Sequence, residues 1–314
     1  MSSITQFAAA RPPASRQRRV LLAASGLLVA ALAGCAPRPA LEPQPPRDAR
    51  QALRRINANL ERIERALYCK ATVSFRFRDA NGHTRRFLGQ PATIIFEAPR
   101  CLYFDIKHGL AGSVARIGSN YEYYWLWVDA QDTRKMWYGT WDALERGLAR
   151  RVIVPPDRLL DALMMRPLPE HLPDGIAPLL ESDGRTSRLL FFKTDAVGWP
   201  YVPREVVLDS QAPYLPIEII DRTPTGRTIM RARLGKYRPV SDSGPAGPYT
   251  PRRYVVDWPA DGAQMRIDLA DVHYRRKDVP FCDFPEGWEG EMEPLDLPAE
   301  APQSRPAPPE TEPS

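Results

Sequence analysis

The alternation of apolar and polar residues over positions 69–78 constrains the fold of this chain more than any other feature. Ala71, Val73, Phe75 and Phe77 alternate with polar residues, which is typical of a β-strand with one buried and one solvated face. Similar short segments recur along the chain, separated by Gly, Pro, Asn and Asp, as in an antiparallel meander. The further strands expected are 87–97, 101–107, 113–118, 121–128, 135–138, 188–193, 204–208, 215–221, 228–234, 253–257, 264–269 and 272–275.

A helix is expected before the first strand. Asp48 is of a residue type that caps helix N-termini, and Gln51 follows three residues later, as in a capping box. The apolar residues beyond it are spaced by three and four and form one stripe; they are Leu53, Ile56, Leu60, Ile63 and Leu67. Mixed charges on the opposite face indicate packing on a protein surface. Two shorter helical segments, 141–148 and 157–165, are expected between two groups of strands.

A sheet with so many strands must curl in order to bury one face. The sequence therefore predicts a mainly β fold of the α+β class. We expect an open, strongly curved antiparallel half-barrel with an N-terminal helix and a helical lid insertion. This domain is expected to span residues 48–285.

The first 34 residues predict a lipoprotein signal peptide. Four arginines precede the apolar stretch 20–32, which is shorter than the roughly 20 residues of a membrane-spanning helix. Leu32-Ala33-Gly34-Cys35 resembles the bacterial lipobox. The resemblance implies that Cys35 is acylated, becomes the mature N-terminus and anchors the protein in membrane lipid. The expected location is the cell envelope, at the outer membrane facing the periplasm, and Ala36 is compatible with that destination.

Two proline-rich segments flank the predicted domain. Residues 35–47 contain five prolines and should form a stiff, extended tether. Residues 286–314 combine prolines with eight carboxylates and one arginine, a composition that predicts a disordered tail. The intervening segment is positively charged, but its charges are scattered. Nucleic acid is therefore not an expected partner, and a protein partner cannot be named from the sequence.

The sequence does not predict an enzyme. Its four histidines, His83, His108, His171 and His273, are not near a serine or cysteine in a catalytic arrangement, and none of the common catalytic or nucleotide-binding motifs is present. No cluster of cysteine and histidine has metal-ligand spacing. We therefore expect neither a cofactor nor a metal site.

Three cysteines remain besides Cys35, so an oxidising compartment permits one disulfide and one free thiol. The alternation places Cys69 with the buried residues of its strand. Cys101 alternates with Leu102 and Phe104 and should face the other way. This pattern disfavours a Cys69–Cys101 bond, and Cys282 could pair with either.

Behind a lipobox, this order of elements resembles the LolA/LolB-like family of lipoprotein carriers and receptors. The resemblance covers residues 49–285, implies the open curved sheet, and adds a helix-covered concavity that receives the acyl chains of lipoproteins in transit. The segments that carry it are 96–104, 108–113, 118–120 followed by Trp125 and Trp127, and 155–157 followed by Leu159 and Leu163. The chain is longer than typical members, and the loop 241–251 and the acidic tail have no counterpart in them.

The predicted function is a membrane-anchored periplasmic lipoprotein that binds acyl chains in a hydrophobic cavity, in lipoprotein or lipid trafficking to the outer membrane. The candidate cavity residues are Phe75, Phe77, Phe96, Phe104, Trp125, Trp127, Trp137, Leu159 and Leu163. The resemblance also implies that Leu110 touches the membrane, and a buried turn residue is the alternative for it. The alternative function is a structural or protein-interaction lipoprotein in which the same aromatic residues fill an ordinary core.

Overall fold

The computed structural model describes residues 44–78, 82–109, 112–130, 133–150, 154, 156–173, 175–183, 186–244, 247–276, 280–285 and 288–297. The predicted signal peptide, Cys35, most of the tether and the end of the tail lie outside these residues. Leu110 also lies outside them. The corresponding predictions therefore remain expectations.

One large sheet dominates the described residues. Its strands, in chain order, are β1 (Leu67–Arg78), β2 (Thr84–Glu97), β3 (Cys101–Lys107), β4 (Ser113–Ser119), β5 (Tyr123–Ala130), β6 (Thr133–Thr140), β7 (Gly175–Ser182), β8 (Ser187–Thr194), β9 (Pro200–Leu208), β10 (Pro216–Arg222), β11 (Thr228–Gly235), β14 (Arg253–Trp258), β15 (Ala263–Tyr274) and β16 (Glu291–Pro294). A short pair, β12 (Arg238–Pro239) and β13 (Tyr249–Thr250), stands apart from it.

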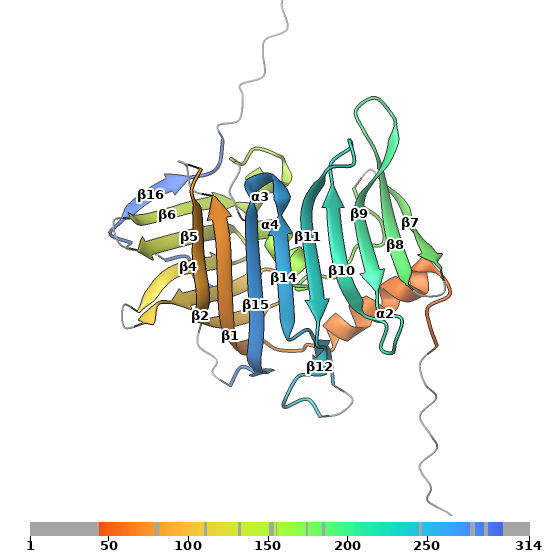
Figure 1. The fold of residues 1–314 in the computed structure, drawn as a ribbon, viewed down its shortest axis with the longest axis horizontal. Helices are drawn as coiled ribbons and strands as arrows, with labels where there is room; N and C mark the ends of the chain where they lie inside the picture. The colour runs from red at the N-terminus through yellow and green to blue at the C-terminus, as the bar shows by residue number, and fades with distance from the viewer. Residues whose placement is uncertain are drawn as a thin grey trace, which may run out of the picture. The chain divides into compact units, whose positions relative to one another are not determined.

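The spatial order of the sheet is β16-β6-β5-β4-β3-β2-β1-β15-β14-β11-β10-β9-β8-β7. Neighbouring strands are antiparallel except for β16, which runs parallel to β6. β1 pairs with β2 on one side and with β15 on the other, so the first strand joins the two groups of strands into one sheet. The predicted open, curved antiparallel sheet is confirmed (Figure 1).

The helices are α2 (Ala49–Glu61), α3 (Trp141–Glu145), α4 (Pro156–Ala162) and a single 3-10 turn, η3 (Pro259–Asp261). In Figure 1, α4 lies behind β14 and β11, and α2 lies at the end of the sheet near β7, in agreement with the contacts of each helix. The expected N-terminal helix and helical insertion are therefore both present. We call the sheet face that carries α2 and α4 the inner face, and the opposite one the outer face.

Strand alternation divides the residues between the two faces. Cys69, Ala71 and Val73 of β1 point inward and join Phe96 and Phe104 in the main core. On β5, Tyr124 and Leu126 belong to the same core. Trp125 and Trp127, which alternate with them, therefore point outward. The sequence pattern of β5 is apolar on both faces and could not reveal which residues point where.

The region after residue 285 differs from its prediction. Residues 280–285 and 288–297 are here called the C-terminal strap. Its Phe284 and Trp288 pack on the outer face against rings of β5 and β6, and its strand β16 extends the edge of the sheet beside β6. Leu295 is 4% exposed, and Glu293 pairs with Lys135 at 2.7 Å. The prediction of a disordered tail starting at residue 286 is therefore wrong for residues 288–297, and the domain does not end at residue 285. Composition averaged over the tail concealed a few apolar and charged residues with specific partners.

Candidate functional site

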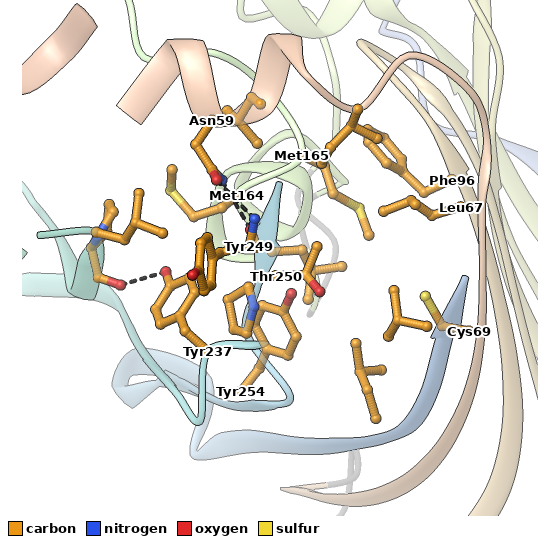
Figure 2. Close-up of a pocket in the computed structure, with 18 of the residues that line it drawn as sticks. Asn59, Leu67, Cys69, Phe96, Met164, Met165, Tyr237, Tyr249, Thr250 and Tyr254 are labelled. Carbon is orange, nitrogen blue, oxygen red and sulfur yellow. Dashed lines mark hydrogen bonds between the residues drawn. The ribbon is translucent and has the colours of Figure 1, made fainter. Parts of the chain in front are cut away.

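An apolar cavity of about 50 Å³ lies on the inner face. Its walls come from α2, from β1 and β2, from the turn after α4, and from the segment around β13 (Figure 2). Lining residues from these four parts are Ile56 and Leu60, Leu67 and Cys69 with Ile94 and Phe96, Leu163 with Met164 and Met165, and Tyr249 with Thr250 and Tyr254. Sites for small ligands are usually about 300–1,000 Å³, so the cavity as it stands is too small for a long hydrocarbon chain.

Helix α2 forms one wall because its apolar stripe faces the sheet. Leu53 and Ile56 are 5% and 1% exposed, as the spacing predicted. The predicted cap is confirmed, since the Asp48 carboxylate accepts a hydrogen bond from the Gln51 amide at 2.7 Å. The helix ends at Glu61, whereas the stripe continued to Leu67, because Leu67 already belongs to β1.

Two asparagines fasten α2 over the cavity. The Asn59 side chain donates to the carbonyl of Tyr249 at 2.9 Å and accepts from its amide at 2.8 Å. Asn57 makes the same pair of bonds to the backbone of Leu168, both at 2.9 Å. Figure 2 shows the Asn59 pair beside the cavity. These four bonds join α2 to the backbone of Leu168 and Tyr249, in addition to the apolar contacts of Leu53 and Ile56.

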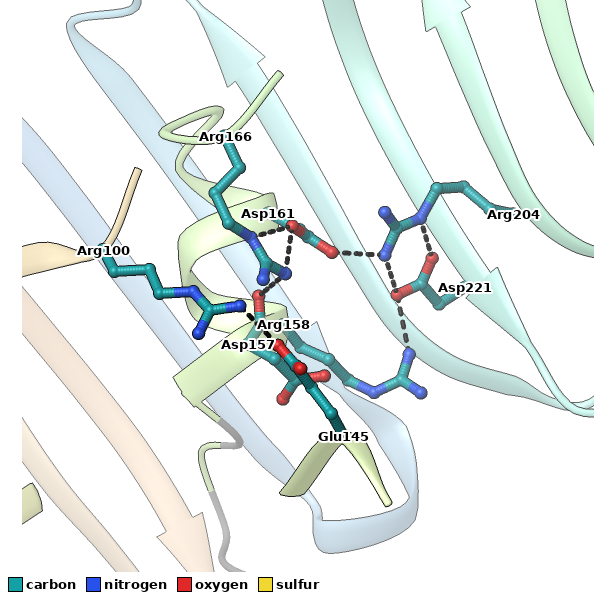
Figure 3. Close-up of polar contacts among 8 residues, drawn as sticks. All are labelled: Arg100, Glu145, Asp157, Arg158, Asp161, Arg166, Arg204 and Asp221. Carbon is teal, nitrogen blue, oxygen red and sulfur yellow. Dashed lines mark hydrogen bonds and ion pairs between the residues drawn. The ribbon is translucent and has the colours of Figure 1, made fainter. Parts of the chain in front are cut away.

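The second covering helix, α4, is held by buried ion pairs (Figure 3). Arg204 of β9 bonds Asp221 of β10 at 2.8 Å and Asp161 of α4 at 2.6 Å. Arg158 of α4 bonds Asp221 at 2.7 Å, and Arg166 bonds Asp161 at 2.8 Å. Asp221 is 2% exposed. Three arginines and two aspartates thus form one ion-pair network in which each aspartate has two arginine partners. Pairing of this kind is the condition under which burial of charge is tolerated.

Burial and the neighbouring arginines together shift the pKa values of Asp157 and Asp161 in α4 in opposite directions. Burial acts to raise the pKa of Asp161, but the guanidinium groups of Arg204 and Arg166 outweigh it and lower that pKa below its ordinary value. Burial dominates at Asp157, where it raises the pKa. The ion pairs that hold α4 on the sheet therefore include an ionised Asp161.

Two polar groups stand out in the apolar lining. The Thr250 hydroxyl is buried and has no hydrogen-bond partner within the described residues, although Thr250 is only 7% exposed. Burial raises the pKa of Cys69 to about 12, so its thiol stays protonated and unreactive at neutral pH. An unsatisfied buried hydroxyl is uncommon in native proteins, and this one faces a space in which a ligand atom could sit.

The candidate cavity residues fall into three groups. Phe96 and Leu163 line the cavity. Phe104 and Leu159 are fully buried in the main core, and Phe75, Phe77 and Trp137 are partly buried against it, but these five residues are not in the cavity wall. Trp125 and Trp127 are on the outer face.

The prediction that Trp125 and Trp127 line the cavity is wrong. The Trp125 ring packs edge-on against Phe284 of the strap at 5.5 Å, and the Trp127 ring packs against Trp288 at 5.2 Å. Both strap residues cover the outer face. The reason is register: Tyr124 and Leu126 occupy the inward positions of β5, and a strand turns successive residues to opposite faces.

Sequence reasoning missed most of the cavity wall. Asn59, Thr250, Tyr237 and Tyr254 come from segments far apart in the chain, and nothing in their local patterns marks them as neighbours. Cys69 was correctly placed among the inward residues of β1 but was not recognised as a cavity residue. Its inward alternation was the one signal available.

The described residues contain no group of three or more His, Cys, Asp or Glu side chains arranged to hold a metal ion. None of the helices in the described part of the chain combines the length and hydrophobicity of a membrane span. The cavity lining is mostly apolar, and the Thr250 hydroxyl in it has no hydrogen-bond partner among the described residues.

No protein-family model and no curated protein matches this sequence. Several solved structures match in fold. A domain assigned to outer membrane lipoprotein sorting, from Vibrio parahaemolyticus, has 11% identity and a TM-score of 0.43 over 74% of this chain and 95% of its own. A DUF1329 family protein from Desulfovibrio piger has 10% identity and a TM-score of 0.45 over 74% of this chain and 95% of its own.

A LolA superfamily protein from Nitrosomonas europaea has 13% identity and a TM-score of 0.42 over 72% of this chain and 94% of its own. A lipoprotein-sorting domain and a LolA superfamily protein are thus among the solved structures to which this chain is similar. The fold assignment itself rests on the strand order and the two covering helices, and likeness at these levels says nothing about ligand or activity.

Proposed function

We propose that this protein is a membrane-anchored periplasmic lipoprotein that binds acyl chains in the cavity beneath α2 and α4. It would take part in lipoprotein or lipid trafficking to the outer membrane, and acylated Cys35 would hold it at the membrane. The observation that carries the proposal is an apolar hollow on the inner face that is lined by α2 and by the turn after α4. A binding function of this kind requires no catalytic group.

The energetics explain why a cavity that opens suits this task. Each buried CH₂ contributes about 0.8 kcal/mol, so moving a chain of roughly 16 carbons into water costs on the order of 10 kcal/mol. A carrier must offset most of that cost and still release its cargo. Opening α2 exposes Leu53, Ile56 and Leu60, and an incoming chain would cover the same apolar surface again.

The hydrogen bonds of Asn57 and Asn59 suit such an opening. Each asparagine replaces its backbone partner with water when α2 lifts, and the net cost of exchanging such a bond is about 0.5–1.5 kcal/mol. The apolar contacts of α2 are regained by the bound chain. The movement is therefore expected to have a small net cost when ligand is present and a larger one when it is absent.

The Thr250 hydroxyl supplies a polar contact for one end of the ligand. A buried donor without a partner costs about 1–3 kcal/mol, and a carbonyl oxygen of an ester, amide or carboxyl group would satisfy it. We therefore expect ligands with a carbonyl at the head of the acyl chain to bind more tightly than plain hydrocarbons of equal length.

The direct test uses the full-length protein purified from envelope membranes in mild detergent. Native mass spectrometry should detect a co-purified molecule with an acyl chain, and a fluorescent fatty-acid analogue should bind and be displaced by lipid. Met165→Glu places a carboxylate in the cavity wall and should abolish this binding. Met292→Glu makes the same change on strap strand β16, where the side chain is 40% exposed, and should leave binding unchanged.

Cys69 provides a second measurement in the unmutated protein. Its thiol lines the cavity, so its rate of alkylation in the native state reports how often the cavity opens. A bound acyl chain should slow that alkylation severalfold. A protein that carries no lipid, binds no analogue and shows the same Cys69 alkylation with and without lipid would contradict the proposal.

The second candidate function is a structural or interaction lipoprotein with a filled core. The small volume of the cavity, about 50 Å³, favours it. The same experiment separates the two candidates, because a filled core cannot protect Cys69 in a ligand-dependent way.

A further inference from the structure

The structure brings two of the three remaining cysteines together. Cys101 begins β3 on the outer face and is 5% exposed. Cys282 lies in the C-terminal strap and is half-buried. Tyr103, two residues after Cys101 on β3, lies in register with Trp125 across β4, and Trp125 packs against Phe284, two residues after Cys282. The Cys282 thiol is close enough to contribute to the raised pKa of Cys101. Both are free thiols in this structure.

Aromatic packing fixes the strap at this place. The ring of Phe284, two residues after Cys282, lies 5.1 Å from Tyr123, 5.5 Å from Trp125 and 5.5 Å from Tyr138, measured between ring centroids. These three partners belong to β5 and β6. The position of Cys282 over the start of β3 is therefore set by packing on the same face and does not depend on the thiol contact alone.

Cys69 is excluded from a bond with either thiol. It points to the inner face, where it lines the cavity, whereas Cys101 and the strap are on the outer face. A disulfide requires Cβ atoms about 3.5–4.5 Å apart, and the sheet separates Cys69 from both partners. The sequence had left this choice open, because Cys282 could have paired with either cysteine.

We propose that Cys101 and Cys282 form a disulfide bond that fastens the C-terminal strap to the outer face of the sheet. The proposal rests on export to an oxidising compartment, as part of the proposed function. The oxidant would be a dithiol oxidase of the envelope, which carries a reactive disulfide. The half-buried Cys282 is the thiol it would reach first.

The electron balance is that of thiol–disulfide exchange. Cys282 loses its proton, and its thiolate attacks one sulfur of the oxidase disulfide, which releases one oxidase thiolate and forms a mixed disulfide. Cys101 loses its proton and displaces the second oxidase sulfur, which closes the Cys101–Cys282 bond. The two cysteines lose two electrons and two protons, and the oxidase disulfide becomes a dithiol.

The surroundings indicate a structural bond. Burial raises the pKa of both thiols above the ordinary value, so neither is the reactive thiolate found in catalytic or redox-sensing cysteines. The two cysteines are also far apart in sequence, and a cross-link between distant positions restricts the unfolded chain strongly. The bond would keep the strap in place when the domain opens on its inner face.

The test maps cross-links in the full-length protein purified from envelope membranes, with N-ethylmaleimide added at lysis to block exchange. Trypsin cuts after Arg100 and Lys107 and again after Lys277. The peptide 101–107 should therefore be recovered joined to the peptide that begins at residue 278, and Cys69 should be recovered without a cross-link. In a second sample, the reduced protein is treated with oxidised glutathione and should form the same cross-link.

The proposal requires the Cys101–Cys282 cross-link in both samples, and its absence from either one, or any cross-link containing Cys69, overturns it. Cys69→Ser serves as the matched control and should leave the cross-link unchanged. The oxidised protein should melt several degrees above the reduced one, and proteases should release the strap only from the reduced form. Neither outcome depends on ligand binding, so a failure here is distinct from a failure of the carrier function.

Discussion

The inner and outer faces of this sheet are made by the same strands but are packed in different ways. The inner face near β1 leaves a cavity, and polar bonds from asparagine and arginine side chains hold the helices above it. The outer face near β5 is filled by aromatic rings from the strands and from the C-terminal strap. One face therefore holds a small apolar cavity beside its covering helices, and the other is filled by aromatic packing.

Charge distribution follows the same division. The ion pairs of the inner face surround Asp221 and Asp161 and are largely buried. Those of the strap, such as Lys135 with Glu291, have partners that are mostly exposed. Buried pairs stabilise only as a complete set, whereas exposed pairs contribute about 0–1 kcal/mol. Single substitutions in the ion pairs that hold α4 should therefore lower the free energy of unfolding more than substitutions in the strap's ion pairs.

The largest effect is expected at the outer face, for Trp125→Ala. Trp125 is 3% exposed and packs against Phe284, and replacing a buried tryptophan with alanine costs about 3–5 kcal/mol in the free energy of unfolding. Urea denaturation would measure it. Ligand binding to the remaining folded protein should be unchanged, since the substitution is on the far side of the sheet. Lost binding in a folded variant would mean that the two faces are coupled.

The next effect concerns the inner ion pairs. Asp221→Ala leaves Arg204 and Arg158 without their shared carboxylate and should lower the free energy of unfolding by about 3 kcal/mol. Glu291→Ala removes an exposed partner of Lys135 and should change it by less than about 1 kcal/mol. Equal losses in the two variants, measured by urea denaturation, would refute the contrast between the faces.

Acid should weaken the ion pairs of Asp161 that hold α4 on the sheet. The pKa of Asp161 is lowered in the folded protein, so the stability it provides is fully present above its ordinary pKa of 3.8 and is lost as the pH falls through the lowered value. Asp157 has a raised pKa and works in the opposite direction. Comparing melting temperatures of the wild type and Asp161→Asn between pH 7 and pH 3 isolates the effect. The variant should lose less stability on acidification than the wild type, and identical acid profiles would show that Asp161 does not hold α4.

The smallest effect on stability is expected for Thr250→Val. The Thr250 hydroxyl has no hydrogen-bond partner in the described part of the chain, so its removal should leave the free energy of unfolding unchanged or raise it by less than about 1 kcal/mol. The affinity for a fatty acid or acyl ester should fall severalfold, because the carbonyl loses its donor. A hydrocarbon without a carbonyl should bind both proteins equally, and Thr250→Ser should restore the tighter binding. A large loss of stability in the valine variant would show that the hydroxyl has a structural partner.

The sequence predicted the elements that depend on local periodicity. Alternation from Cys69 to Phe77 and the stripe of α2 identified the first strand and helix with their buried faces. β7 and β16 were missed. β7 has mostly exposed residues and no clean alternation, and β16 is short, acidic and stabilised by its pairing with β6.

The sequence by itself determined an antiparallel sheet with a covering helix, because a period of two or of 3.6 is a property of consecutive residues. Only the tertiary structure decided which side of β5 faces the cavity, that Asn59 meets Tyr249, and that Cys282 meets Cys101. Each of these depends on segments distant in the chain, and the pairing of distant segments is set by the packing of the whole sheet. Local sequence patterns therefore do not predict which distant segments pair.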